Sequence, residues 1–290
     1  MFARRRLDLS TEARKDLSGS FARLSSGVTH YEFRGDAHGE TVVLIHGNAA
    51  PYVTWDRTIE GLAAAGFRVL RYDLFGHGLS DRPKLPTYDR RFYNGQLADL
   101  LGRLNVPYPV LIVGTSQGGS IGACFAAQNP GKVRKLALLA PFLDELPGSR
   151  KVAIRLVKVP LIGELLMGLM SDAKLADLSD AVVNVHTGAS LQRDVLQQFR
   201  FRGKRRGILA NLRGDALQDA TDCYLGVKEQ SIPVLLTWGT ADQKIAGESM
   251  KKLRALFPDI EYHELEAAGH LAHYEFPERI NPILIRFLTN

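Results

Sequence analysis

The sequence predicts an α/β fold: a mostly parallel, doubly wound sheet with an inserted helical block. Short apolar runs typical of buried strands alternate with amphipathic stretches typical of helices, which is the pattern of a parallel sheet. This alternation stops near residue 142 and resumes near residue 231, and the stretch between reads as helical. The predicted organisation is a core over 20–141 and 231–290, a helical cap over 142–230 and an N-terminal extension over 1–19.

The composition agrees with an ordinary globular protein. The chain has 290 residues, of which 45% are apolar and 23% charged, close to the average for globular domains. No apolar run is long enough to cross a bilayer, and no apolar stretch of the kind found in secretory signals follows the basic N-terminus. Two cysteines do not make a disulfide framework, and Cys124 is expected to be a small core residue. These features predict a reducing, cytoplasmic location.

The net charge is +6, with much of the basic excess between 150 and 213 and a basic cluster at 200–206. Such a cluster could bind nucleic acid or an anionic membrane. No nucleic-acid-binding motif accompanies it, so a solvated helical face is the expectation. Stable membrane insertion of 152–170 is not expected, because Pro160 interrupts this stretch and Lys158 and Glu164 break up its apolar face.

The first half of the chain contains most of the predicted strands. Val28–Arg34 alternates as a half-buried strand should, and Thr41–Ile45 is a continuous apolar run. The later predicted strands cover 67–72, 110–113 and 133–140. Helices are predicted over 52–65, where Trp55, Ile59 and Leu62 share one face, and over 91–104 and 119–128.

In the second half, the block 142–230 has apolar helical stretches at 152–170, 191–201 and 206–217. Its apolar residues are expected to include substrate contacts. The plainer alternative is that they pack the cap onto the core, as for Leu161, Ile162, Leu165, Leu166 and Leu169. Strands follow at 232–238 and 260–265, and helices at 246–256 and from about 277. His270 and His273 lie three residues apart without a third ligand, so no metal and no cofactor are predicted.

One sequence motif indicates a catalytic nucleophile. Gly114-Thr115-Ser116-Gln117-Gly118 lies between the strand 110–113 and the helix 119–128, the context that a nucleophile elbow requires. The tight turn places Ser116 in a strained conformation with its hydroxyl pointing outward. Glycines two residues before and after remove the Cβ atoms that would collide there. The free N–H groups of the following helix point at any negative charge beside Ser116.

Ser116, Asp242 and His270 each follow a predicted strand, at the sheet edge where ligands bind in such folds. Their order along the chain and the surrounding motifs resemble the α/β-hydrolase superfamily over about residues 28–288. The resemblance implies an eight-stranded sheet with an inserted cap. The matching motifs are H-G-N at 46–48, D-L-F-G-H-G-L-S-D at 73–81, G-T-S-Q-G-G at 114–119, G-T-A-D at 239–242 and G-H at 269–270.

The resemblance implies a role for each residue. Ser116 would be the nucleophile, His270 its general base and acid, and Asp242 the group that orients His270. The backbone N–H groups of Gln117 and Asn48 would form the oxyanion hole. Because these donors belong to the backbone, side-chain substitution at 48 or 117 is expected to cost less activity than substitution of Ser116.

Alternatives remain at several of these positions. Asp242 could cap the following helix, and Asp144, after the strand 133–140, is the rival acid. His273 is the rival to His270. Residues near the site are expected to be structural: His46 and His77 beside glycines, and Asp73 and Asp81 as acceptors of backbone hydrogen bonds that hold their loop.

The residues at position 116 and after His46-Gly47 favour some reactions of the superfamily over others for this chain. Dehalogenases and epoxide hydrolases of the superfamily use Asp where this chain has Ser116, and the H-G-G-G loop of lipases is absent. Carbon–carbon hydrolases of ring-cleavage products usually carry a G-P-G segment after H-G, where this chain has 48–51, N-A-A-P. The main prediction is therefore a capped serine esterase acting on a small-to-medium carboxylic ester; lipid-like esters are one kind that would fit the apolar cap. The alternatives are a carbon–carbon hydrolase and a slow hydrolase used as a ligand sensor. The oligomeric state is not predicted.

Overall fold

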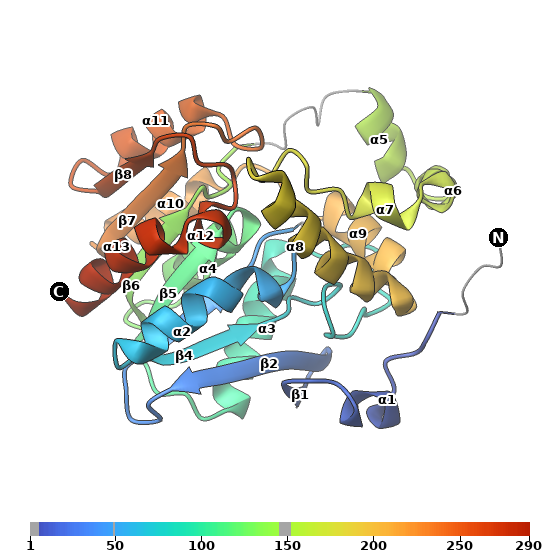
Figure 1. Cartoon of the computed structure of the whole chain (residues 1–290), viewed down its shortest axis with the longest axis horizontal. Coiled ribbons are helices and arrows are strands. Elements are labelled where there is room, and N and C mark those ends of the chain that lie inside the picture. The colour runs from blue at the N-terminus through green and yellow to red at the C-terminus, as the bar shows by residue number, and fades with distance from the viewer. Residues whose placement is uncertain (1–5, 49, 145–151) are drawn as a thin grey trace.

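A single eight-stranded sheet runs through the protein (Figure 1). The structure is a computed structural model that describes residues 6–48, 50–144 and 152–290. The strand order is β1-β2-β4-β3-β5-β6-β7-β8. The strands are β1 (Ser20–Leu24), β2 (Gly27–Gly35), β3 (Thr41–Ile45), β4 (Arg68–Tyr72), β5 (Val110–Thr115), β6 (Val133–Leu139), β7 (Val234–Gly239) and β8 (Glu261–Leu265).

The sheet is mostly parallel, as predicted. Strand β2 runs antiparallel to both β1 and β4, and every other neighbouring pair is parallel. Strand β1 was not predicted from the residues, because its five residues are half polar and pair with β2 alone. Central strand β3 pairs with β4 and β5, so that Val43 lies opposite Leu70 and Ile112.

Helices cover both faces of the sheet and bury two apolar clusters. Val43 and Ile45 of β3 belong to one cluster, whereas Val42 and Leu44 belong to the other, because successive side chains of a strand point to opposite faces. The first cluster is covered by α3 (Arg90–Arg103), α4 (Gln117–Gln128), α10 (Thr221–Glu229) and α11 (Gly247–Leu256). The second lies under α2 (Asp56–Ala64) and α13 (Pro277–Thr289).

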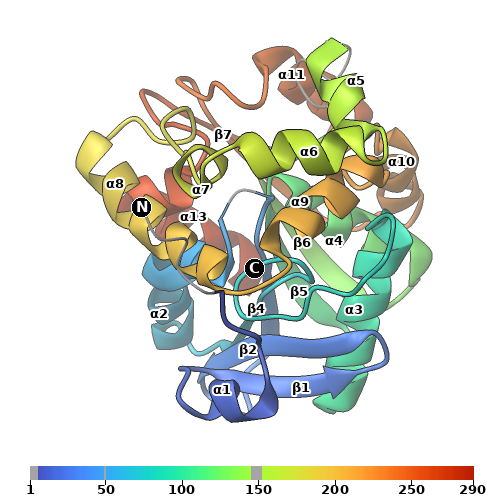
Figure 2. The same ribbon diagram turned by 90° about the vertical axis from the view of Figure 1, so that its right-hand side faces the viewer.

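The segment between β6 and β7 is helical. Helices α5 to α9 gather in the upper part of Figures 1 and 2, whereas α10 packs on α4 and belongs to the first apolar cluster. The division into core and cap stays a prediction. The helices are α5 (Val152–Lys158), α6 (Ile162–Leu169), α7 (Asp172–Leu175), α8 (Val185–Gln197), the 3₁₀ turn η2 (Gln198–Arg200) and α9 (Lys204–Arg213).

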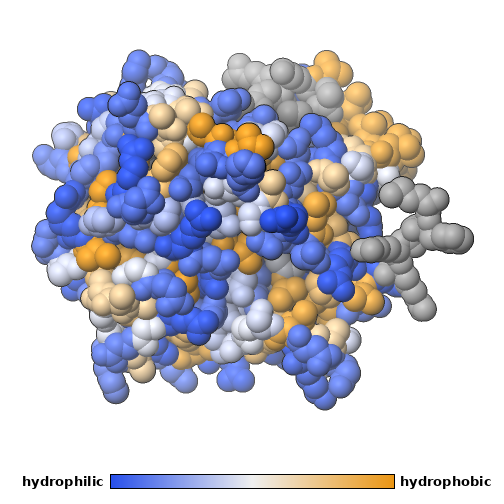
Figure 3. All heavy atoms as spheres, viewed as in Figure 1, coloured by the Kyte–Doolittle hydropathy of each residue, from blue (hydrophilic) through white to orange (hydrophobic). Residues whose placement is uncertain are grey.

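Helix α6 corrects one expectation about the cap. Leu161, Leu165 and Leu169 are 83%, 64% and 77% exposed, so they do not pack the cap onto the core, and they are not among the residues that line the cavity beside Ser116. They lie four residues apart on the outer face, while Gly163 and Met167 face inward. The orange patch at the upper right of Figure 3 lies where Figure 1 places this part of the cap.

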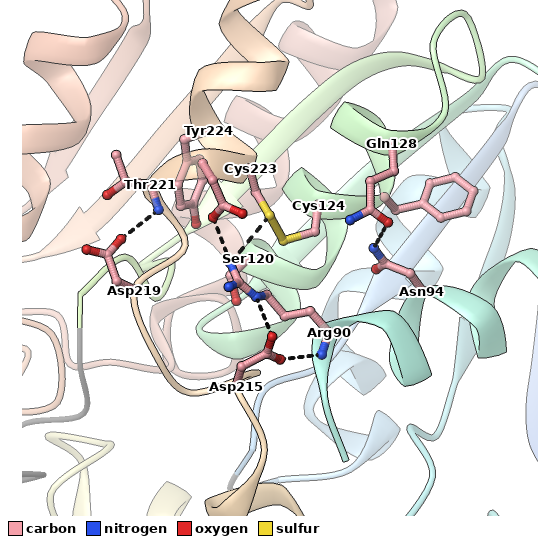
Figure 4. Close-up of a disulfide and its surroundings, with 12 residues drawn as sticks. Arg90, Asn94, Ser120, Cys124, Gln128, Asp215, Asp219, Thr221, Cys223 and Tyr224 are labelled. Atoms are coloured by element: carbon pink, nitrogen blue, oxygen red, sulfur yellow. Dashed lines mark hydrogen bonds and ion pairs between the residues drawn. A yellow bond between two sulfur atoms is a disulfide. The ribbon is translucent and has the colours of Figure 1, made fainter. Parts of the chain in front are cut away.

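The two cysteines correct another expectation. Cys124 of α4 and Cys223 of α10 form a disulfide (Figure 4), although 99 positions separate them. A Cβ on Gly226 would lie 2.7 Å from Cβ of Ala127, so the lack of a side chain at 226 lets α10 approach α4 closely. Disulfides persist mainly in oxidising compartments, which counts against the predicted cytoplasmic location. None of the helices in the described ranges is long and apolar enough to cross a membrane.

Candidate active site

Ser116 occupies a sharp bend between β5 and α4. Its φ of 53° and ψ of −125° lie outside the regions that non-glycine residues favour, which confirms the predicted strain. Three backbone hydrogen bonds hold the bend: Ser116 donates to Leu139 O, and its carbonyl accepts from the N–H groups of Gly119 and Phe142, each over 3.0 Å. The surrounding fold therefore imposes the conformation that the sequence motif predicts.

Glycines surround this bend because neighbouring backbone leaves no room for a side chain. A Cβ on Gly114 would lie 2.5 Å from Gly118 O, and one on Gly118 would lie 2.1 Å from Ile45 O. A Cβ on Gly47 would lie 2.9 Å from Cβ of Ser116. The loop after β3 thus packs directly against the serine.

Asp242 and His270 form a pair at the ends of β7 and β8. His270 Nδ1 and Asp242 Oδ2 are 2.8 Å apart, and the Asp242 side chain is fully buried. Asp242 Oδ1 accepts the N–H groups of Lys244 and Ile245 over 2.7 and 2.9 Å. Because one carboxylate oxygen is held by the backbone turn, the other is oriented toward the imidazole. A neutral His270 that donates from Nδ1 keeps Nε2 as a proton acceptor.

Ser116 and His270 lie on the wall of the same cavity, although no hydrogen bond joins their side chains. The cavity measures about 190 Å³, which suits a small substrate. Among the residues that the structure describes, Lys244 is the one lysine or arginine on its wall, and none of them lines it with a carboxylate. The described lining residues are Gly47, Asn48, Ala50, Thr54, Ser116, Phe142, Ala181, Leu217, Lys244, Ile245, His270 and Leu271.

The predicted oxyanion donors belong to two different segments next to Ser116. Gln117 is the first residue of α4, and Asn48 follows Gly47 in the loop after β3. Neither backbone N–H donates to another residue that the structure describes. The Asn48 carbonyl accepts a hydrogen bond from His77 Nε2 over 2.8 Å, which fixes the orientation of this peptide segment.

The rival residues have other partners. Asp144 accepts from Ser249 Oγ over 2.6 Å and pairs with Lys252 Nζ at 3.0 Å, so it does not orient His270. His273 is fully buried, and its Nε2 lies 3.1 Å from Thr54 Oγ1.

Asp73 holds its loop as expected, by accepting the N–H groups of Tyr52 and Leu79 over 2.9 Å each. Sequence reasoning missed its partner His30, whose Nδ1 lies 2.7 Å from Asp73 Oδ2. Burial would raise the pKa of Asp73, but the hydrogen bond and charge of His30 outweigh it and lower that pKa. Asp81 instead accepts the N–H of Val28 over 2.7 Å and so holds the start of β2.

Asn211 of α9 and Lys244 on the cavity wall are site residues that the sequence did not reveal. The buried side-chain amide of Asn211 donates to Asn48 Oδ1 over 2.7 Å and bonds both polar atoms of the Gln117 side chain. An asparagine in a helical stretch carries no pattern that would mark it, because its partners lie 163 and 94 positions away in the sequence.

Three buried histidines predict a stability loss in acid. Burial is the main cause that lowers the pKa of His46 to about 4 and of His273 to about 3, and it lowers the pKa of His77 well below 6.5. These imidazoles stay neutral in the folded chain, whereas the unfolded chain binds protons below pH 6.5. The free energy of unfolding therefore has its full value above about pH 6.5. As the pH falls from there toward 4, each histidine lowers this free energy by roughly 1 kcal/mol per pH unit.

Urea unfolding at about pH 7 and about pH 5 measures this slope. Glutamine does not titrate in this pH range, so His273→Gln should remove about a third of the difference in unfolding free energy between the two conditions. The pKa of Asp73 contributes only below 3.8, outside this window. An unfolding free energy that stays constant between the two conditions would contradict the buried neutral state of these histidines.

No group of three or more His, Cys, Asp or Glu side chains within the described ranges could hold a metal ion. The described groups at the cavity are the Ser116 hydroxyl, the His270 imidazole, which Asp242 orients, the Lys244 ammonium and backbone N–H groups.

Comparison with known proteins places the chain in a family. Residues 40–277 match the family model described as the alpha/beta hydrolase fold. A 2-hydroxy-6-oxononadienedioate/2-hydroxy-6-oxononatrienedioate hydrolase of Cupriavidus pinatubonensis is 29% identical over 284 residues, covering 93% of this chain and 95% of the relative. The enzyme of that name from Paraburkholderia xenovorans is 30% identical over 288 residues, covering 94% and 96%.

Among solved structures, one from a study of carboxylesterases of Nitrososphaera gargenis superposes with a TM-score of 0.73. It is 26% identical and covers 93% of this chain and 98% of its own. The fold, the motif positions and these matches together show that the chain belongs to the α/β-hydrolase family and is a hydrolase.

Proposed function

We propose that the protein is a serine hydrolase that cleaves the carbon–carbon bond beside the ketone of a small 2-hydroxy-6-oxo-dienoic acid. This reverses the order of the two reactions predicted from sequence, where ester cleavage came first. The observation that carries the proposal is the full-length similarity to the two dienedioate hydrolases, at 29–30% identity. The alignment covers at least 95% of the length of each of them.

The cavity supports an acidic substrate. Over the described ranges 6–48, 50–144 and 152–290, Lys244 is the one lysine or arginine that lines it, and no carboxylate from these ranges lines the wall to repel an anion. The Lys244 ammonium pairs at 3.2 Å with Asp180, but both side chains are substantially exposed, at 39% and 62%. Exposed pairs of this kind contribute little, so a substrate carboxylate can replace Asp180 as the partner of Lys244.

The proposed reaction uses the geometry around Ser116. His270 takes the Ser116 proton as the hydroxyl oxygen attacks the substrate ketone, and the N–H groups of Asn48 and Gln117 stabilise the tetrahedral oxyanion. Before the bond breaks, the 2-hydroxyl proton of the substrate shifts to the carbon next to the ketone and gives the diketo tautomer. When the oxyanion then collapses, the carbon–carbon bond breaks and its electron pair is delocalised through the neighbouring double bond onto the 2-keto oxygen as a dienolate, which His270 protonates to the 2-hydroxydienoic acid. Water activated by His270 then hydrolyses the acyl-enzyme. The net reaction adds one water across the cleaved bond.

Ester hydrolysis is the second candidate. It needs the same residues, with an alkoxide as the leaving group. The 26% identity to a structure from a carboxylesterase study favours it, as does the N-A-A-P sequence at 48–51, where carbon–carbon hydrolases usually carry G-P-G.

The two reactions can be compared in one assay series with the purified chain. We expect loss of the visible absorbance of 2-hydroxy-6-oxonona-2,4-dienedioate with a kcat/KM at least about 100-fold above that for p-nitrophenyl acetate, since the contact of Lys244 with a substrate carboxylate and the apolar contacts of the cavity wall contribute to transition-state binding. Turnover of p-nitrophenyl esters alone would establish the second candidate. A chain that turns over neither substrate and reacts with no fluorophosphonate probe would refute both.

Lys244→Met is expected to raise KM for the dienedioate by about tenfold, the loss of one charge-assisted contact. The effect on p-nitrophenyl acetate, which carries no carboxylate, should be much smaller. Lys252→Met is the matched control, because Lys252 pairs with Asp144 and does not line the cavity. An equal loss for both substrates in Lys244→Met would contradict recognition of an acid by this lysine.

A further inference from the structure

The side chain of Asn211 has partners for its whole hydrogen-bonding capacity. Nδ2 donates to Asn48 Oδ1 over 2.7 Å and to Gln117 Oε1 over 3.1 Å. Oδ1 accepts from Gln117 Nε2 over 2.8 Å and from the Tyr93 hydroxyl over 3.1 Å. An asparagine amide offers two N–H groups and one oxygen with two lone pairs, so no capacity is left over. Asn211 is also fully buried, where such bonds are costly to break.

Two of the hydrogen-bond partners of Asn211, Asn48 and Gln117, have a predicted role in catalysis. Asn48 and Gln117 are the residues whose backbone N–H groups are assigned to the oxyanion hole. They lie on separate elements, the loop after β3 and the first turn of α4, and no other hydrogen bond joins their side chains within the described chain. Asn211 is thus the group that links one donor residue to the other.

The helix that carries Asn211 is firmly docked. A Cβ on Gly207 of α9 would lie 3.0 Å from Cα of Gly76, so the two backbones are in contact. Lys204 Nζ, at the start of α9, donates to Gly76 O over 3.2 Å and is buried. The same region holds His77, which bonds the Asn48 carbonyl. The position of α9 therefore determines where the Asn211 amide holds Asn48 and Gln117.

We infer that Asn211 is a positioning residue of the cap: it holds the Asn48 and Gln117 side chains so that their backbone N–H groups converge on the oxyanion formed at Ser116. The inference rests on the proposed function and applies to either candidate reaction, because both pass through an oxyanion. Losing one oxyanion donor outright costs about 10²- to 10³-fold in kcat. Misplacing donors that remain present should cost less, roughly 10- to 100-fold.

The test is Asn211→Leu, which has a similar volume and no polar atoms. We expect kcat to fall roughly 10- to 100-fold with KM nearly unchanged, because the donors act on the transition state. Binding of a trifluoromethyl ketone, which forms an oxyanion with Ser116, should weaken by the same factor as kcat/KM. A purely structural role predicts instead a lower melting temperature, with kcat and inhibitor affinity retained in the folded fraction.

Two further variants complete the test. Arg213→Gln removes bonds that α9 makes to Lys158 O, Val159 O and Glu164, all within the cap, and it should leave kcat and inhibitor affinity at the wild-type level. Asn48→Ala breaks the link from the other side and remains informative if Asn211→Leu does not fold. It should lower kcat by a similar factor, and adding Asn211→Leu should lower it little further, because both changes break one link.

The outcomes separate the inference from the proposed function. Wild-type turnover that is unchanged in both Asn211→Leu and Asn48→Ala overturns the inference and leaves the hydrolase assignment intact. A wild-type chain that shows no turnover and no fluorophosphonate labelling overturns both. If Arg213→Gln lowers kcat as much as Asn211→Leu does, the inference is also overturned, because any disturbance of the cap would then be enough to lower kcat.

Discussion

Ser116→Ala is expected to abolish turnover, with kcat falling by roughly 10⁶-fold, as for loss of a nucleophile that acts as a unit with its base. The variant removes only the hydroxyl, at a position where the bend is held by backbone hydrogen bonds to Leu139, Gly119 and Phe142. The fold should therefore persist, and circular dichroism and the melting temperature should match those of the wild type. Steady-state turnover and fluorophosphonate labelling measure the loss.

The preceding residue supplies a matched control. Thr115 carries a buried hydroxyl with no hydrogen-bond partner among the described residues, so Thr115→Val removes a hydroxyl of the same elbow at little cost. It should retain activity and labelling. Turnover that survives in Ser116→Ala would assign the nucleophile elsewhere and would contradict both proposed reactions.

Asp242→Asn is expected to lower kcat by about 10⁴-fold, the cost of presenting a base in the wrong tautomer. The N–H groups of Lys244 and Ile245 still require an acceptor, so the amide oxygen of the new side chain takes their place. Its NH₂ group then faces Nδ1 of His270 and makes that nitrogen an acceptor. The imidazole proton moves to Nε2, which can no longer accept the Ser116 proton.

Asp144→Asn is the control for this prediction. Its partners are Ser249 and Lys252, and its loss should leave kcat near the wild-type level. The comparison is made from pH–rate profiles of kcat/KM for both variants. A large loss in Asp144→Asn with activity retained in Asp242→Asn would show that the rival acid serves His270.

The local features of the site were predictable from the sequence because they depend on short-range sterics. Gly114 and Gly118 are required by contacts within a few residues of Ser116 or with the adjacent strand β3. The alternation of strands and helices predicted the parallel sheet, since buried parallel strands read as continuous apolar runs.

Other features depended on contacts that no local pattern records. Strand β1 is short and half polar, so it is identified only by its pairing with β2. The disulfide requires α4 and α10 to pack closely, which a separation of 99 positions does not reveal. The exposure of Leu161, Leu165 and Leu169 depends on which face of α6 meets the rest of the cap.

The sequence by itself determined the alternation of strands and helices and the strained serine elbow, because each follows from backbone geometry over a few residues. The order of Ser116, Asp242 and His270 along the chain indicated the acid and the base through its resemblance to the α/β-hydrolase superfamily. Only the tertiary structure decided that Asp242 rather than Asp144 meets His270, and that Asn211 bridges Asn48 and Gln117. Those pairings join segments far apart in the chain, and their geometry is determined by how whole helices and strands pack.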